Sequence, residues 1–218
     1  MRAFFSRILY VILLRPWLKL IIGVRYRNHK VVNNTDQFIL VANHNSHFDT
    51  LSIMAAMRYK QFKKTHAVAV EDYFGKTSLS AAAVRFFFNA ILISRTSRGA
   101  KIDPITQMSN ALDAGKSLIL YPEGTRGKPG AMADFKRGVA ILLKDHPNVP
   151  FIPVYLEGFG KVLPKSKTLI LPMNCTVRFG KPIFPKSDEI EEILDEVKAA
   201  ILSLQKKDER YTNDFEDI

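Results

Sequence analysis

The sequence predicts an α/β fold in which helices cover a mixed, largely parallel sheet. Two observations carry this prediction. Short apolar runs of strand length alternate with segments of helical spacing along most of the chain, the arrangement from which parallel sheets are built. The chain has 218 residues, of which 47% are hydrophobic, enough to bury the core of one such domain. We place that domain at residues 31–207 and find no internal repeat.

The predicted strands are short apolar runs bounded by turn-forming residues. They are expected at Phe38–Ala42, His66–Val70, Ile91–Ser94, Ser117–Tyr121, Phe151–Leu156 and Cys175–Phe179. The segment Val149–Val154 contains two prolines. Because proline cannot complete a hydrogen-bonded ladder, we expect this segment at a sheet edge or in the wall of a groove.

Helices are predicted where apolar residues recur with the helical period. They are expected at Phe48–Tyr59, Leu79–Ala90, Pro104–Ala114, Gly138–Lys144 and Asp188–Lys207. Pro104 suits the start of its helix, where a missing N–H costs nothing. Ser187 is the expected N-cap of the last helix, whose first turn is acidic, as the helix dipole favours. Residues 208–218 are expected to form an acidic tail.

Residues 1–30 are strongly apolar but interrupted by basic side chains. No stretch reaches the roughly 18–20 apolar residues that a spanning helix needs, and no small-residue cleavage site of a signal peptide follows. On a helical wheel Arg7, Arg15, Lys19 and Arg25 fall within an arc of roughly 120°. This pattern predicts an interfacial membrane anchor, divided at Pro16, whose basic side chains reach lipid phosphates. A buried core helix is the alternative.

The charge is unevenly distributed. The net charge is +11. Residues 1–70 and 71–186 each carry +9, whereas residues 187–218 carry −7. A basic body indicates an anionic partner, such as nucleic acid, an anionic membrane or a phosphorylated substrate. The sequence contains no nucleic-acid-binding motif, and its histidine spacing fits no metal site. We therefore expect neither nucleic acid nor a metal ion to bind. The single cysteine, Cys175, permits no intrachain disulfide.

The segment Asn43–Asp49 follows the first predicted strand, and strand ends are where open α/β sheets place ligands. His44 is a candidate general base, because imidazole titrates near neutral pH, and Asp49 is a candidate to orient it. Five positions apart on one helix, the two would lie about 140° apart. Their contact therefore requires His44 to lie in the loop before the helix. The alternative is that Asn43 and His44 only cap this helix.

Cationic residues follow two further strands. Arg95 comes directly after Ile91–Ser94. The segment Tyr121–Gly127 contains a glycine, which lets backbone N–H groups approach an anion, and Arg126, whose planar guanidinium suits phosphate. The alternative for Tyr121–Gly127 is a polar turn with a surface arginine.

Taken together, these segments resemble the lysophosphatidic acid acyltransferase branch of the glycerolipid acyltransferases. That family carries an N-H-x-x-x-x-D block, a strand ending in Arg, a (F/Y)-P-E-G-T-R block and a V-P-(I/V)-x-P-(V/I) block, in that order. The blocks stand here as Asn43–Asp49, Ile91–Arg95, Tyr121–Arg126 and Val149–Val154. Gly127 replaces the serine that often follows the third block, a departure that bears on the headgroup of the acceptor.

The resemblance implies an enzyme that moves a fatty acyl group from acyl-CoA or acyl carrier protein to the free hydroxyl of 1-acylglycerol-3-phosphate, giving phosphatidic acid. It implies His44 as the base and Asp49 as the residue that orients it, with no metal, cofactor or covalent acyl-enzyme on Cys175. The substrate-binding residues that it implies are Arg95, Glu123, Gly124, Thr125, Arg126 and Pro153.

The implied partners are an anionic membrane, a lysophospholipid acceptor and the thioester donor, without nucleic acid. We expect the protein on the cytoplasmic face of a membrane, as a peripheral or monotopic protein. Two alternatives are open. The acceptor is another lysophospholipid or a lyso-aminolipid, or the chain is a non-catalytic lipid-binding protein.

Overall fold

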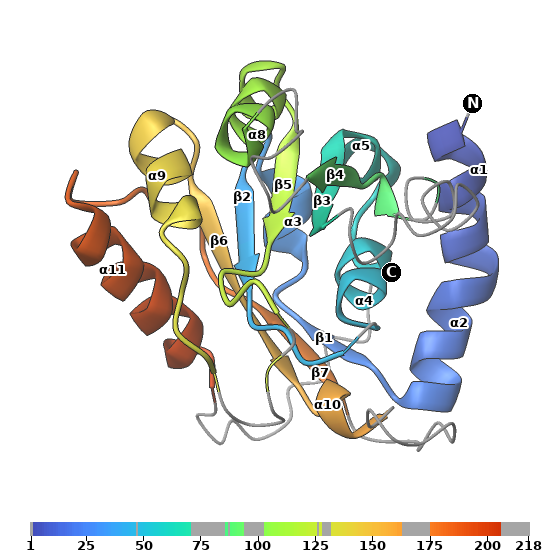
Figure 1. Ribbon diagram of the computed structural model, residues 1–218. Helices are drawn as coiled ribbons and strands as arrows, with labels where there is room; N and C mark the ends of the chain where they lie inside the picture. Colours follow the sequence, from blue (N-terminus) through green and yellow to red (C-terminus); the bar gives the residue numbers. More distant parts are fainter. Residues whose placement is uncertain are drawn as a thin grey trace.

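The computed structural model describes residues 2–46, 48–70, 86, 88–93, 103–125, 127, 132–162 and 175–205. These residues form three layers, with a twisted sheet between two groups of helices (Figure 1). The alternation of strands and helices in the sequence therefore leads to the expected α/β architecture. The predicted acidic tail and most of the helix predicted at Leu79–Ala90 lie outside the described residues.

Seven strands form one sheet in the order β1-β7-β6-β2-β5-β3-β4. Their bounds are β1 Arg25–Arg27, β2 Ile39–Ala42, β3 Thr65–Val70, β4 Ile91–Ile93, β5 Ser117–Leu120, β6 Phe151–Glu157 and β7 Thr176–Phe179. Every neighbouring pair is parallel except β6 and β7, which run antiparallel. The predicted mixed, largely parallel sheet is confirmed.

Helices cover both faces of this sheet (Figure 1). The longer ones are α4 Phe48–Ala55, α5 Tyr59–Lys64, α8 Pro104–Asp113, α9 Gly138–Asp145 and α11 Ile190–Ser203, and the short ones are α3 Lys30–Asn34 and α10 Phe159–Val162. Pro104 occupies the first turn of α8, as predicted, behind Asp103, whose carboxylate accepts hydrogen bonds from two backbone N–H groups. A proline and a capping carboxylate together therefore fix the start of α8.

The central strand β2 is buried on both faces, as a strand in a parallel sheet should be. Successive side chains of a strand point to opposite faces. Leu40 and Ala42 belong to the core beneath α4, α5 and the N-terminal helix. Ile39 and Val41 belong to the core beneath α8, α9 and α11. The carboxyl end of β2 is therefore held from both sides.

The N-terminal segment is one continuous helical rod beside the sheet (Figure 1). It consists of α1 Arg2–Leu9, the π-helical turn η1 Tyr10–Leu14, α2 Arg15–Trp17 and the π-helical turn η2 Leu18–Ile22. The predicted division at Pro16 is wrong, because Leu14 and Leu18 on either side of α2 keep right-handed helical dihedrals. Gly23, in the left-handed conformation, ends the rod.

The expected outward orientation of the basic arc is wrong for Arg7 and Arg15, whereas Lys19 is exposed as predicted. Arg7 is only 8% exposed, and its guanidinium lies over the Phe62 ring. Arg15 donates two hydrogen bonds to the carbonyl of Ala55, at the end of α4, where helix carbonyls lack intrahelical partners. Arg25 lies in β1 and not in a helix. Arg7 and Arg15 therefore face the domain, because α4 and α5 offer them partners there.

Three further predictions differ from the structure. The helix predicted at Phe48–Tyr59 ends at Ala55, and a second helix, α5, begins at Tyr59. The N-cap of α11 is Glu189, whereas the Ser187 hydroxyl accepts from the Glu189 N–H before the helix begins. Finally, β6 lies between β2 and β7 and not at an edge.

The position of Pro153 explains how a proline fits into a central strand. The carbonyl of Pro153 accepts from Gly180 N–H, on the β7 side, and β7 ends at Phe179. The N–H and C=O of one strand residue point to the same side of the strand. The side on which Pro153 lacks an N–H is therefore the β7 side, one residue beyond the end of β7. A Cβ on Gly180 would come within 2.6 Å of Pro153 Cγ, so only glycine admits the proline ring there.

Candidate active site

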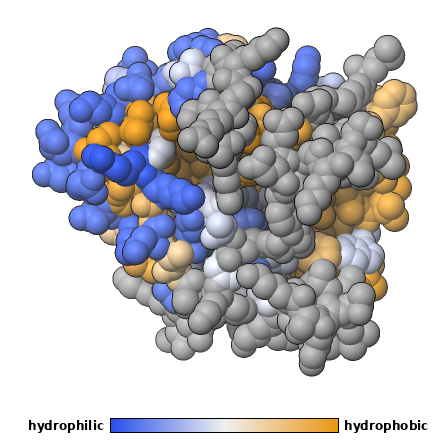
Figure 2. All heavy atoms as spheres, in the orientation of Figure 1, coloured by the Kyte–Doolittle hydropathy of each residue, from blue (hydrophilic) through white to orange (hydrophobic). Residues whose placement is uncertain are grey.

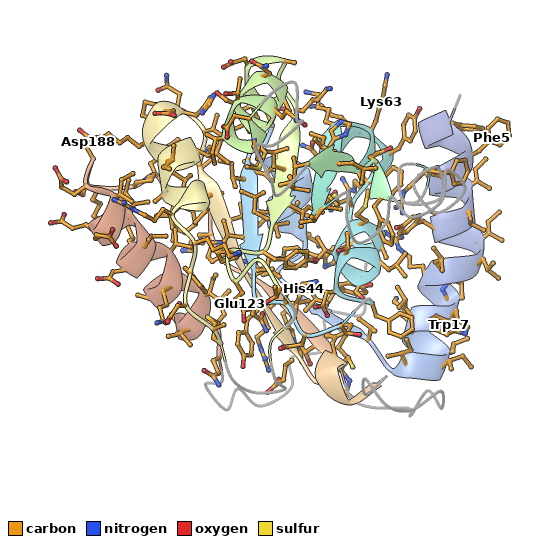
Figure 3. All side chains as sticks on the ribbon, viewed as in Figure 1. Phe5, Trp17, His44, Lys63, Glu123 and Asp188 are labelled. Carbon is orange, nitrogen blue, oxygen red and sulfur yellow. The ribbon has the colours of Figure 1, made fainter. Side chains whose placement is uncertain are left out.

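The candidate site lies at the carboxyl ends of β2 and β5, where His44 and Glu123 are side by side (Figure 3). β2 and β5 are parallel neighbours, with Val41 paired to Leu120. The loops that follow them therefore leave the sheet at the same edge. This topology brings together the first and third sequence blocks.

His44 and Asp49 form a hydrogen-bonded pair, with 2.8 Å between His44 Nδ1 and Asp49 Oδ2. The His44 side chain is 20% exposed and that of Asp49 is fully buried. The same Oδ2 accepts the backbone N–H groups of Asn45 and Ser46, at 2.7 and 2.8 Å. The Asp49 carboxylate at the start of α4 therefore holds the preceding loop around itself. His44 lies in that loop, as its contact with Asp49 requires.

This arrangement assigns the imidazole tautomer. Oδ2 of Asp49 already accepts two backbone N–H groups, and a carboxylate accepts hydrogen bonds but donates none. Its third partner, Nδ1 of His44, is therefore the donor and carries a proton. Nε2 then carries the lone pair, and none of the described residues hydrogen-bonds to it. Nε2 is thus the nitrogen at which His44, a partly exposed side chain, can accept a proton.

The third block and Gly127, which follows it, clamp the backbone of His44 at its N–H and at its carbonyl. Oε1 of the buried Glu123 accepts the backbone N–H of His44 at 2.9 Å. The backbone N–H of Gly127 donates to the His44 carbonyl at 2.9 Å. The other oxygen of Glu123 accepts the N–H of Ala133 at 2.9 Å. Glu123 therefore uses both oxygens to join three segments of the backbone.

Asn43 fastens the same loop to β6. Its side-chain amide donates to the carbonyl of Leu156 at 2.9 Å, and its side-chain oxygen accepts the Leu156 N–H at 2.7 Å. This pair continues the ladder between β2 and β6 beyond Ala42, in the way that a strand residue would. Asn43 is therefore a sheet extension, whereas a helix-capping role was the alternative drawn from the sequence.

Tyr121, the first residue after β5, covers one face of the imidazole. The ring centroids of His44 and Tyr121 are 4.1 Å apart and the rings are inclined by 20°. The Tyr121 hydroxyl is 2.8 Å from Thr50 Oγ1, next to Asp49 on α4. Burial, and then the charge of Asp49, raise the pKa of Tyr121 well above its usual value, so its hydroxyl keeps its proton.

The other predicted residues are placed differently. Gly124 adopts a left-handed conformation in the turn, and Lys136 lies across it so closely that a Cβ would come within 2.7 Å of the lysine chain. Thr125 is exposed at the end of the turn, whereas Pro153 is buried in the sheet. Arg95 and Arg126 lie outside the described residues.

The single cysteine is closer to the site than its place in the sequence indicates. Cys175 is buried, and burial followed by the charge of Asp49 raises its pKa to about 12. Such a thiol is not a nucleophile near neutral pH. Across the described ranges, no group of three or more His, Cys, Asp and Glu side chains is placed to hold a metal ion.

Sequence reasoning missed the contact of Tyr121 with His44 and the sheet-extending role of Asn43. Both residues follow the last residue of a strand directly, Tyr121 after β5 and Asn43 after β2. That position at the active edge of a parallel sheet is the signal that was available.

Comparison with known proteins gives the family. A family model described as Acyltransferase matches residues 23–157. The chain is 26% identical over 165 residues to a chloroplastic 1-acyl-sn-glycerol-3-phosphate acyltransferase of Brassica napus, covering 75% of this chain and 45% of that protein. It is 25% identical over 171 residues to 1-acyl-sn-glycerol-3-phosphate acyltransferase alpha of Ovis aries, covering 77% of this chain and 57% of that protein. The chain thus spans about half the length of these relatives.

A solved structure shares the fold. The crystal structure of a 1-acyl-sn-glycerophosphate acyltransferase from Thermotoga maritima superposes with a TM-score of 0.76 and 20% sequence identity, covering 97% of this chain and 83% of that one. The family match includes the His44–Asp49 pair and the Glu123 clamp and ends with β6. The chain belongs to the acyltransferase family.

Proposed function

We propose that this protein transfers a fatty acyl group from an acyl thioester to the free hydroxyl of 1-acylglycerol-3-phosphate, giving phosphatidic acid. The observation that carries the proposal is the His44–Asp49 pair, with Nε2 of His44 left open on a family-matched scaffold. Acceptor identity rests on the relatives in Brassica napus and Ovis aries, whose names specify that substrate. Acyl-CoA and acyl carrier protein are both suitable donors.

In the proposed reaction, Nε2 of His44 takes the proton of the acceptor hydroxyl as that oxygen attacks the thioester carbonyl. The imidazolium that forms is stabilised by the buried Asp49 carboxylate, which holds Nδ1–H. The tetrahedral intermediate collapses, the C–S bond breaks, and the leaving thiolate takes the proton from Nε2 of His44, which returns the imidazole to its neutral form. A covalent acyl-enzyme is not required, because the acceptor itself supplies the nucleophile.

The third block has two parts in this proposal. Glu123 serves through the backbone, since both of its oxygens bind N–H groups, at His44 and Ala133. Gly124 and Thr125 shape the turn, and Arg126, with Arg95, binds the acceptor phosphate. Pro153 supports the site from within β6. Arg126→Ala should therefore weaken the use of phosphate-bearing acceptors more than it weakens donor binding.

We also propose that the outer face of the N-terminal helix rests in the membrane interface. Among the described residues, eight of the eleven exposed large apolar side chains lie on this helix, namely Phe4, Phe5, Ile8, Val11, Ile12, Leu13, Leu20 and Ile21. An apolar region is visible over α1 at the edge of the molecule (Figure 2). No helix in the described ranges is long and apolar enough to cross a membrane. An interfacial anchor fits this surface, and we infer that it lies on the cytoplasmic face.

The first test measures thiol release from palmitoyl-CoA in detergent, with and without 1-acylglycerol-3-phosphate, for the wild type and His44→Ala. Release that requires both the acceptor and His44 is expected. Release without acceptor would indicate a thioesterase instead. A panel of lysophosphatidylcholine, lysophosphatidylethanolamine and lyso-aminolipid acceptors, each with both donors, would identify a different acceptor. Turnover with none of them would favour a lipid-binding protein.

A further inference from the structure

Four contacts hold His44 and its imidazole. The backbone is held by Glu123 and Gly127, Nδ1 is held by Asp49, and one face of the ring is covered by Tyr121. The first three contacts fix the position of the residue and the direction of one nitrogen. They still allow a coupled change of χ1 and χ2 that keeps the Nδ1 hydrogen bond but swings Nε2, and the stacked Tyr121 ring opposes this movement.

We propose that Tyr121 is a positioning residue that aims Nε2 of His44 at the acceptor hydroxyl, an inference that rests on the proposed acyl transfer. An imidazole stacked at 4.1 Å cannot swing through χ1 and χ2 without losing this contact or colliding with the phenol ring. Proton transfer requires close alignment of the reacting atoms, and a displacement of about 1 Å costs about a hundredfold in rate.

The hydroxyl of Tyr121 adds a second constraint. Its 2.8 Å hydrogen bond to Thr50 ties the end of β5 to the first turn of α4, one residue after Asp49. The phenol therefore fixes both partners of the catalytic pair, His44 through its face and Asp49 through the neighbouring residue. The aromatic face, with its negative charge density, also favours the imidazolium that forms during transfer.

The two constraints can be separated by substitution. Tyr121→Leu removes the ring, whereas Tyr121→Phe keeps the ring and removes only the hydroxyl. Thr50→Val removes the partner of that hydroxyl from α4 and is the matched control for Tyr121→Phe. Should Tyr121→Leu fail to fold, Tyr121→Met also lacks the ring, and its unbranched, flexible side chain fills an irregular gap more readily.

The test combines steady-state kinetics with the NMR signals of the His44 imidazole. In Tyr121→Leu, kcat should fall by about ten- to a hundredfold with KM for both substrates unchanged. Tyr121→Phe and Thr50→Val should show smaller decreases that match each other. The His44 ring protons, assigned with His44→Ala, should be shifted upfield by the ring current in the wild type and Tyr121→Phe, but not in Tyr121→Leu. In a His44→Ala background, Tyr121→Leu should not lower the residual rate further.

Several outcomes would overturn the inference. One is an active wild type whose kcat survives Tyr121→Leu, and this would leave the proposed acyl transfer intact. Another is that Tyr121→Leu lowers the rate by the same factor in the His44→Ala background as in the wild type, which would mean that Tyr121 does not act through His44. A wild type that shows the ring-current shift but transfers no acyl group would overturn the proposed function, and with it the role given to Tyr121.

Discussion

The backbone N–H of His44 donates to Oε1 of Glu123 at 2.9 Å, so a carboxylate 79 positions further along the chain fixes the candidate base. Because the other oxygen of Glu123 binds Ala133 N–H, neither oxygen can be replaced by a donor.

Glu123→Gln is therefore expected to impair both stability and turnover. The amide NH2 would face a backbone N–H, which leaves a buried donor unsatisfied and should lower the free energy of unfolding by about 1–3 kcal/mol. Chemical denaturation and the thiol-release assay measure the two effects. Glu191→Gln, at an exposed carboxylate paired with Arg137, is the control and should change neither. Wild-type stability of Glu123→Gln would contradict the clamp.

Asp49→Asn should reduce turnover by about 10²–10⁴, the range typical of general-base catalysis. The asparagine oxygen can take the place of Oδ2, which accepts all three hydrogen bonds, but it carries no charge and therefore stabilises the imidazolium much less than the carboxylate does. Combined with His44→Ala, the substitution should cause little further loss, since residues that act as one unit are not additive. The exposed Asp36→Asn is the control. If the loss of turnover in the double variant instead equals the product of the two single losses, His44 and Asp49 do not act as one unit.

Asn43→Ala should lower the free energy of unfolding by about 1–3 kcal/mol, because it leaves the buried N–H and carbonyl of Leu156 without their partners. Asn43→Asp keeps an acceptor for the Leu156 N–H but sets a carboxylate against the Leu156 carbonyl, so it should not restore stability. Urea denaturation measures both variants. If Asn43→Asp is as stable as the wild type, the pair of hydrogen bonds between the Asn43 side chain and the Leu156 backbone does not stabilise the fold.

His29 should make the fold sensitive to mild acid. Burial first, and then Arg15, Lys30, Lys19 and Arg58, lower its pKa from 6.5. The unfolded chain therefore binds a proton before the folded one does. The contribution of His29 to stability is present above pH 6.5 and is lost as the pH falls toward the lowered pKa.

The measurement for His29 is the free energy of unfolding between about pH 7 and pH 5, for the wild type and His29→Asn. The wild type should lose more stability over this window than the variant. Parallel curves would show that other groups account for the acid response.

The outer face of the N-terminal helix is tested by vesicle flotation. Ile12→Glu with Leu20→Glu should reduce binding to anionic vesicles at least about tenfold, since each buried leucine-sized side chain contributes about 1.5–3 kcal/mol. Leu202→Glu, at an exposed apolar residue of α11, is the control and should bind like the wild type. If all three proteins float equally, this face is not the anchor.

Most of the sheet was predictable from the sequence because its strands are short apolar runs. The predicted strands at Phe38–Ala42 and Ser117–Tyr121 agree with β2 and β5 to within one residue at each end. The edge strand β1 was missed because Arg25-Tyr26-Arg27 is not an apolar run. The predicted helix at Phe48–Tyr59 ran past the end of α4 because Ala56–Arg58 contains no glycine or proline, and α5 was missed.

The site was predictable to a lesser degree. The spacing of His44 and Asp49 set a condition on the loop, and the structure meets it. The contacts of Glu123 with His44 and Ala133 depend on which strands are neighbours, and local sequence does not encode that order. The inward direction of Arg15 likewise depends on a carbonyl 40 positions away.

The buried side of the N-terminal helix has a practical consequence. Tyr10, Leu18 and Ile22 are fully buried in the same core as Leu40 and Met54. Removing residues 1–22 to obtain a fragment that is easier to purify would uncover this core and the carbonyl of Ala55, which Arg15 binds. Such a truncation would yield an aggregating remnant, so detergent-free preparations are better sought by recoding the exposed residues of the rod than by deleting it.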